Sequence, residues 1–136
     1  MRAVLDANVL ISAVLSPRGS PARLVLMWQA GAFDLVVSPL LLAEVRRALA
    51  YPKLERLVAA ADADAFVDWL GRTAEIAADP GGPPPVRSDD PDDDYLISLA
   101  AAERALLVSG DAHLTSLASR LPIRTPAEFL SELGER

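Results

Sequence analysis

The chain has 136 residues, of which 51% are hydrophobic and 24% are charged. This composition predicts one globular domain over residues 1–136 and excludes a disordered or collagen-like chain. The absence of cysteine excludes disulfides, thiolate catalysis and cysteine-ligated metal centres, and the single histidine, His113, excludes a metal site made only of histidines. Lys and Arg number 13 against 19 Asp and Glu, a net charge of −6, which disfavours a passive nucleic-acid binder that depends on a basic surface.

No stretch of the sequence has the pattern of a targeting or membrane segment. An acid, Asp6, already lies near the start, and no later apolar run approaches the roughly 18 residues that a membrane span needs. We therefore expect a soluble, cytoplasmic protein without a membrane anchor.

The first half of the chain predicts two strands and three helices. The expected elements are a strand at 2–5, a helix at 9–15, a helix at 20–30, a strand at 33–37 and a helix at 39–50. Short apolar runs favour buried strands. Ser-Pro pairs at the second and third helix mark helix starts, because the hydroxyl accepts a bond from a free amide and proline lacks the amide that would go unpaired.

The second half continues the alternation. The expected elements are a helix at 60–78, a Pro/Gly-rich loop at 79–85, a helix at 94–104, a strand at 105–109 and a closing helix from Pro126. The first of these helices is expected from apolar residues at offsets of three and four, including Ile76. Strands that alternate with helices predict an α/β fold with a mainly parallel sheet covered on both faces.

Four acids are placed where such a sheet binds ligands, outside the carboxyl ends of its strands. Asp6 ends the first strand, and Asp111 follows the strand at 105–109. Glu44 lies in the second turn of the helix after the second strand, and Asp94 opens the helix after the acidic run 89–94. Taken singly, each has a simpler explanation as a helix cap, a solvated helix start or the polar edge of a helix.

Their joint placement points to a divalent cation. Converging carboxylates repel one another and raise one another's pKa unless a cation neutralises them. Oxygen ligands without cysteine suit Mg²⁺ or Mn²⁺. A calcium-binding EF-hand loop beginning at Asp90 is excluded by spacing, because Tyr95 stands where glycine is required and Ala101 where the bidentate glutamate belongs.

Four motifs together resemble the PIN-domain ribonucleases, and most closely the VapC-type toxins of bacterial toxin–antitoxin pairs. These motifs are VLDANVLISA (4–13), SPLLLAEV (38–45), DPDDDYLISLA (90–100) and LVSGD (107–111). The resemblance implies a three-layer α/β/α sandwich, metal-dependent endoribonuclease activity on RNA, a homodimer and inhibition by a cognate antitoxin.

The resemblance also implies which residues form the site. The acids carried over are Asp6, Glu44, Asp94 and Asp111. Within the acidic run the match prefers Asp94, because of the apolar stretch that follows it, and Asp93 is retained as a substitute or supporting ligand. Asn8 and Ser109 are expected to hydrogen-bond the acids.

Other functions also place acids at the strand ends of a parallel sheet. A phosphoacceptor receiver domain needs a lysine beside its acids, and the only lysine, Lys53, lies outside any strand-end motif. A catalytically silent PIN-fold binding module and a housekeeping RNA-processing nuclease remain as alternatives. We expect His113 to be a surface or structural residue, since a bound metal can supply the activated water without it.

Overall fold

The computed structural model describes residues 1–134 and contains a five-stranded sheet in the order β3-β2-β1-β4-β5. The strands are β1 (Arg2–Leu5), β2 (Asp34–Val37), β3 (Glu75–Ile76), β4 (Leu106–Val108) and β5 (Ile123–Arg124). Each neighbouring pair is parallel. The helices are α1 (Ala7–Leu15), α2 (Ser20–Gln29), α3 (Pro39–Leu49), α4 (Pro52–Glu55), α5 (Ala60–Thr73), the 3₁₀-helix η1 (Pro91–Asp93), α6 (Asp94–Ala102), α7 (Ala112–Thr115) and α8 (Pro126–Gly134).

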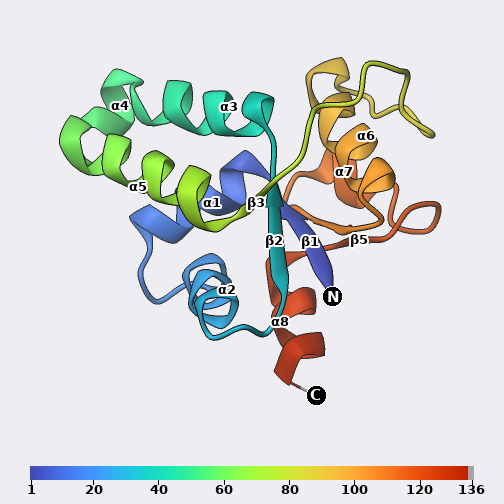
Figure 1. The fold of residues 1–136 in the computed structure, drawn as a ribbon, viewed down its shortest axis with the longest axis horizontal. Coiled ribbons are helices and arrows are strands. Elements are labelled where there is room, and N and C mark those ends of the chain that lie inside the picture. The colour runs from blue at the N-terminus through green and yellow to red at the C-terminus, as the bar shows by residue number, and fades with distance from the viewer. Residues whose placement is uncertain (135–136) are drawn as a thin grey trace.

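Helices cover both faces of the sheet. In Figure 1, α1, α2, α3 and α5 lie on one side of the strands, and α6 and α7 lie on the other. The central strands β1, β2 and β4 are nearly continuous apolar runs because both of their faces are buried, as is typical of parallel sheets. The predicted α/β sandwich with a parallel sheet is therefore confirmed.

The order of the strands creates a crevice at the carboxyl end of β1. The chain moves from β1 to β2 on one side and later returns to place β4 on the other side of β1. Leu5 and Val108 are register partners, and the backbone N–H of Asp6 donates to the Val108 carbonyl at 2.9 Å. A change of direction of this kind separates the loops on either side and leaves room for a ligand.

The main departure from the predicted elements is at the end of α5. That helix ends at Thr73, Ala74 is extended, and Glu75–Ile76 forms the edge strand β3 beside β2. The prediction of helix through residue 78 was therefore wrong, because Ile76 fits a helical apolar stripe but belongs to the sheet. The short helix α4 was also not predicted, and α1 begins at Ala7 instead of Val9.

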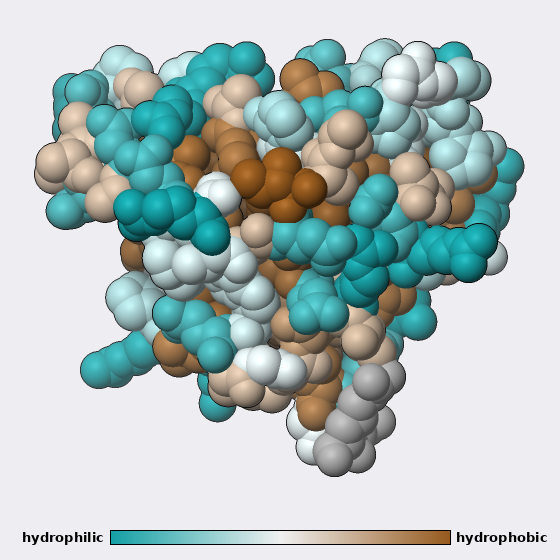
Figure 2. Space-filling model, in the orientation of Figure 1, coloured by the Kyte–Doolittle hydropathy of each residue, from teal (hydrophilic) through white to brown (hydrophobic). Residues whose placement is uncertain are grey.

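The edge strand leaves part of the sheet exposed. Ile76 is 54% exposed, and Figure 2 shows a patch of hydrophobic surface where Figure 1 places β3, on a face that is otherwise largely hydrophilic. Within residues 1–134, no helix combines the length and the apolar character that crossing a membrane demands.

The three hydroxyl–proline pairs differ in whether the hydroxyl caps the helix; they are Ser20-Pro21, Ser38-Pro39 and Thr125-Pro126. Ser38 caps α3, since its Oγ accepts from the N–H of Leu41 at 3.3 Å. Thr125 and Glu128 form a reciprocal capping box at the start of α8, with bonds of 3.1 and 2.8 Å. Ser20 lies inside α2, whose N-cap is Gly19.

Phe129 of α8 is one of the largest side chains of the buried core, and its replacement by alanine should strongly destabilise the fold. Its side chain is fully buried and its ring packs edge-on against Phe33, with ring centroids 5.0 Å apart. Phe129→Ala should lower the free energy of unfolding by about 3–5 kcal/mol, measured by chemical denaturation. Leu57→Ala is the control: Leu57 is 70% exposed, and its loss should change stability by less than about 0.5 kcal/mol.

Candidate active site

Asp6 is a buried carboxylate at the carboxyl end of β1. It is only 3% exposed, and one oxygen, Oδ2, accepts a hydrogen bond from the hydroxyl of Ser109 at 2.7 Å. Although Asp6 is the N-cap residue of α1, it makes no side-chain capping bond. The helix-cap explanation therefore does not account for this acid.

Ser109 connects two of the acids. It is fully buried, and while its hydroxyl donates to Asp6 it accepts the backbone N–H of Asp111 at 3.0 Å. Asp111 also caps α7, since its Oδ1 accepts the backbone N–H of His113 at 2.9 Å. The His113 ring lies beside the same oxygen, with Nδ1 at 3.4 Å. Two hydrogen bonds therefore hold Asp111: its backbone N–H donates to Ser109, and its side chain accepts from the first turn of α7.

The acidic run turns Asp93 toward this cluster. Asp90 starts η1 by accepting the N–H of Asp92 at 3.0 Å, and the turn that follows is a 3₁₀-helix. In a 3₁₀-helix, residues three apart lie on the same side, which aligns Asp93 with Asp90. Asp93 is 8% exposed, and its Oδ2 is buried without a hydrogen-bond partner.

Asp94, which the sequence match preferred, points elsewhere. Its Oδ1 accepts the backbone N–H of Ser88 at 2.8 Å, and its Oδ2 lies 3.5 Å from the guanidinium of Arg87. Both oxygens are thus engaged by the loop before η1. The structure brings Asp6, Asp93 and Asp111 together and does not bring Asp94 into the group, because α6 begins only after the 3₁₀ turn has set the direction of each side chain.

Glu44 approaches Asp6 from α3. Its Oε2 accepts a hydrogen bond from the hydroxyl of Tyr95, a residue in the first turn of α6. Burial and the adjacent Glu44 raise the pKa of the Tyr95 phenol above its ordinary value, so this hydroxyl remains a donor. Sequence reasoning did not identify Tyr95 as a site residue, since no local pattern indicates a contact across 51 positions.

Asn8, expected to hydrogen-bond the acids, has an exposed position. Its side chain forms no hydrogen bond within the described part of the chain, while its backbone N–H, near the Asp6 carboxylate, partly opposes the rise in the pKa of Asp6. Asn8 lines the space around the acids and does not brace them, in contrast to Ser109.

Burial and neighbouring acids raise the pKa of Asp6 and of Asp93. Burial is the largest cause of the raised pKa of Asp6; the Ser109 hydrogen bond opposes it, and the charges of Glu44 and Asp111 add to it. Burial, followed by the charges of Asp111 and Asp6, raises the pKa of Asp93 to about 7. A group of carboxylates that is difficult to ionise in this way favours a proton or a cation in its midst.

The raised pKa of Asp93 predicts that the free energy of unfolding, measured in the presence of a chelator, depends on pH. Unfolded Asp93 releases its proton near its ordinary pKa of 3.8 and folded Asp93 releases it near 7, so the folded state binds more protons between these values. The contribution of Asp93 to the free energy of unfolding therefore falls as pH rises from about 4 to 7. In denaturation curves over this range, Asp93→Asn should gain about 1–3 kcal/mol relative to wild type. A difference that stays constant with pH would contradict the shift.

The donor set fits a divalent cation. Oxygens of Asp90 and Asp93 and a ring nitrogen of His113 lie within 4.8 Å of one another, and Asp93 also adjoins Asp6 and Asp111. The buried Oδ2 of Asp93 is the observation that decides the fit. It has no donor, and the contact of Asp93 with Asp111 is between two carboxyl groups, which is costly unless a proton or a cation lies between them.

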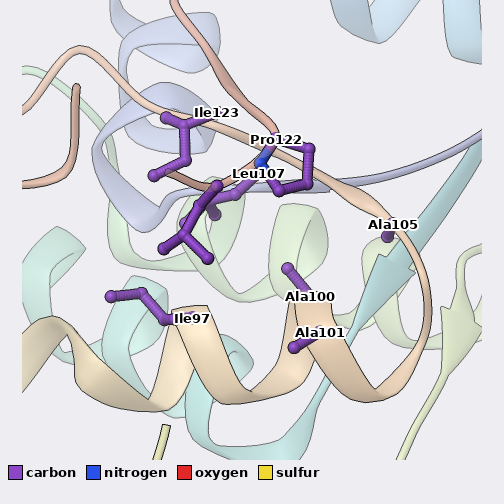
Figure 3. Close-up of a pocket in the computed structure, with 8 residues that line it drawn as sticks. Ile97, Ala100, Ala101, Ala105, Leu107, Pro122 and Ile123 are labelled. Carbon is purple, nitrogen blue, oxygen red and sulfur yellow. The ribbon is translucent and has the colours of Figure 1, made fainter. Parts of the chain in front are cut away.

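Open grooves flank these acids. One has a volume of about 510 Å³ and includes Glu44, Asn8 and Asp92 in its lining. Another, of about 310 Å³, is lined on its polar side by Asn8, Ser12 and Asp111. By contrast, the cavity in Figure 3, between α6 and the strands β4 and β5, has a volume of only about 30 Å³ and an aliphatic lining without a carboxylate. The grooves therefore open onto Glu44 and Asp111, the two outer acids of the group.

Comparison with known proteins identifies the family and the fold. The family model described as PIN domain matches residues 2–113. An uncharacterised protein of Methanocaldococcus jannaschii is 25% identical over 142 positions, which cover 97% of this chain and 91% of that protein.

Two solved structures share the fold. One is a chain in the structure of VapBC2 from Rickettsia felis bound to a DNA fragment from its promoter, with a TM-score of 0.62 and 19% identity over 92% of this chain and 98% of that chain. The other is PAE2754 from Pyrobaculum aerophilum, with a TM-score of 0.61 and 17% identity over 100% of this chain and 97% of that chain.

Proposed function

The chain belongs to the PIN-domain family, and from this premise we propose that it is a divalent-metal-dependent endoribonuclease, the toxin of a toxin–antitoxin pair. The observation that carries the proposal is the convergence of Asp6, Asp93 and Asp111 at the crevice beside β1, with one buried oxygen of Asp93 left unpartnered. PIN domains are generally nucleases, so the family membership supports hydrolysis of a phosphodiester.

Asp6, Asp93 and Asp111 would hold Mg²⁺ or Mn²⁺, with Glu44 adding negative charge from α3. Asp90 and His113, whose donor atoms lie within 4.8 Å of a carboxylate oxygen of Asp93, could complete the ligand set. Asp93 takes the place that the sequence match gave to Asp94, since both oxygens of Asp94 are engaged by Ser88 and Arg87. When bound, the cation supplies an activated water and neutralises charge on the phosphodiester as it is attacked.

The protein's own contribution is to hold these oxygens in place before substrate arrives. Ser109 fixes one oxygen of Asp6, and the phenol of Tyr95 fixes one oxygen of Glu44. Asp111 is fixed by the first turn of α7. Each acid thus retains an orientation that would otherwise be lost to charge repulsion. No side chain is required as the nucleophile, and His113 is assigned no essential proton transfer.

The proposal is tested by cleavage of a single-stranded RNA in the presence of Mg²⁺, Mn²⁺ or EDTA. We expect cleavage with either cation, none in EDTA, and recovery when the cation is restored. Activity should weaken at acid pH, because protons compete with the cation for the carboxylates. Undiminished cleavage in excess chelator, by protein free of contaminating nuclease, would refute the mechanism.

A protein partner is part of the proposal. The VapBC2 structure supports a cognate antitoxin, and both proteins would act in the cytoplasm, where the RNA is. A shallow groove of about 400 Å³ with a mainly apolar lining, which includes Val14, Val25, Leu26 and Phe66, offers surface for protein contact.

We also propose a homodimer. The 51% hydrophobic content is high for a chain of this size, and some of the exposed apolar surface would be covered by a second copy. Light scattering at micromolar concentration should give twice the mass of the chain. A monomer throughout that range would contradict the homodimer.

A further inference from the structure

One face of α3 lines the groove of about 510 Å³ that includes Glu44, hereafter the α3 groove. The lining residues from this segment are Leu40, Ala43, Glu44, Arg47, Ala48 and, just beyond the helix, Tyr51. Those within α3 are spaced three and four apart, so they share one helical face, and Tyr51, the residue before α4, extends the line. The acids account for Glu44 but not for the other residues of this face.

Arg47 is the cation of the α3 groove. Among the groove's lining residues in the described part of the chain it is the only basic one, and within residues 1–134 it forms no salt bridge. Its neighbour Arg46 lies off this face and is held by Asp64 and Asp68 of α5, at 2.8 and 3.1 Å. In a protein of net charge −6, an uncommitted guanidinium one helical turn from Glu44 is suited to a phosphate.

Tyr51 supplies an aromatic surface four residues beyond Arg47. Tyr51 is 57% exposed, so its ring is accessible to a ligand. Exposed Leu40, at the other end of the face, adds apolar area. An aromatic ring beside a cation is the combination that holds single-stranded nucleic acid, because bases stack on the ring and the cation binds the backbone.

We infer that the α3 groove binds one unpaired nucleotide of the substrate next to the reacting phosphodiester, with its base stacked on Tyr51 and a phosphate held by Arg47. This inference rests on the proposed ribonuclease function. The volume of the groove fits, since pockets for small organic ligands measure about 300–1,000 Å³. Stacking is tolerant of base identity, so the subsite selects single-stranded RNA over duplex and does not by itself define a cleavage sequence.

The test measures the Kd of a labelled single-stranded RNA by fluorescence anisotropy, in an Asp6→Asn background that does not cleave it. Arg47→Gln should weaken binding about five- to tenfold and reduce the slope of log Kd against log salt by about 0.7, the loss of one phosphate contact. Tyr51→Ala should weaken it about five- to fiftyfold. Tyr51→Phe, which keeps the ring, and Arg46→Gln, the matched arginine on the other face, should retain the affinity.

The same substitutions in protein that retains Asp6 distinguish failure of the proposed subsite from failure of the proposed nuclease function. Normal RNA cleavage together with unchanged Kd in Arg47→Gln and Tyr51→Ala would overturn the subsite and leave the proposed function intact. A wild-type protein that binds RNA through these residues but does not cleave it would support the subsite and overturn the function. Equal weakening for duplex RNA on Tyr51→Ala would overturn stacking, because paired bases cannot reach the ring.

Discussion

Asp6→Asn should abolish RNA cleavage while leaving the fold intact. The amide is nearly the same size as the carboxylate, and its oxygen can still accept the Ser109 hydroxyl that bonds Asp6 at 2.7 Å. The substitution removes one of the negative charges that a divalent cation needs at this site. We expect the rate to fall by about 10³-fold or more, measured as single-turnover cleavage with saturating Mg²⁺ or Mn²⁺.

The folded state of this variant should be as stable as wild type or more so. Burial raises the pKa of Asp6 and neighbouring acids add to the effect, so an ionised Asp6 opposes folding in the absence of cation. Asp34→Asn is the matched control, because Asp34 is exposed at the start of β2, at the opposite edge of the sheet from the acids, and its substitution should leave most of the rate. Full cleavage by Asp6→Asn would contradict the assigned role.

Asp93→Asn should be nearly as damaging as Asp6→Asn, and Asp94→Asn should be mild. Asp93 is buried with an unpartnered oxygen and is influenced by Asp111 and Asp6. Asp94 instead accepts the N–H of Ser88 and adjoins Arg87. We expect a loss of about 10²-fold or more for Asp93→Asn, measured as kcat/KM on the same RNA.

The two aspartates are adjacent in the sequence, so the pair controls for local charge and helix start. The small effect expected for Asp94→Asn comes from a looser loop before η1, which a thermal melt would register. A severe loss of cleavage in Asp94→Asn with a normal Asp93→Asn would restore the assignment that the sequence match preferred.

The order of strands and helices could be predicted because each buried strand is a compact apolar run and each long helix has a clear start. The two-residue edge strands β3 and β5 could not, since two residues carry no periodicity, and Ile76 also fits a helical stripe. What places β3 in the sheet is its pairing with Val36 and Val37, nearly forty residues earlier. Contacts at that separation leave no trace in local pattern.

For the same reason, the positions of some acids could be predicted from the sequence and those of others could not. Asp6 and Asp111 follow strands, so the parallel sheet alone brings them to one edge. The choice between Asp93 and Asp94 depends on whether the turn before α6 is a 3₁₀-helix or an α-helix, and the run of acids allows both. The bond from Tyr95 to Glu44 depends on how α3 and α6 meet beyond the end of the sheet.

The most direct test of the central claim is anomalous diffraction from crystals of the protein grown with Mn²⁺. We predict a manganese peak in contact with the carboxylates of Asp6, Asp93 and Asp111, and loss of that peak in Asp93→Asn. No peak at these acids at saturating Mn²⁺, or manganese bound at Asp94 instead, would contradict the metal site on which the proposed nuclease depends.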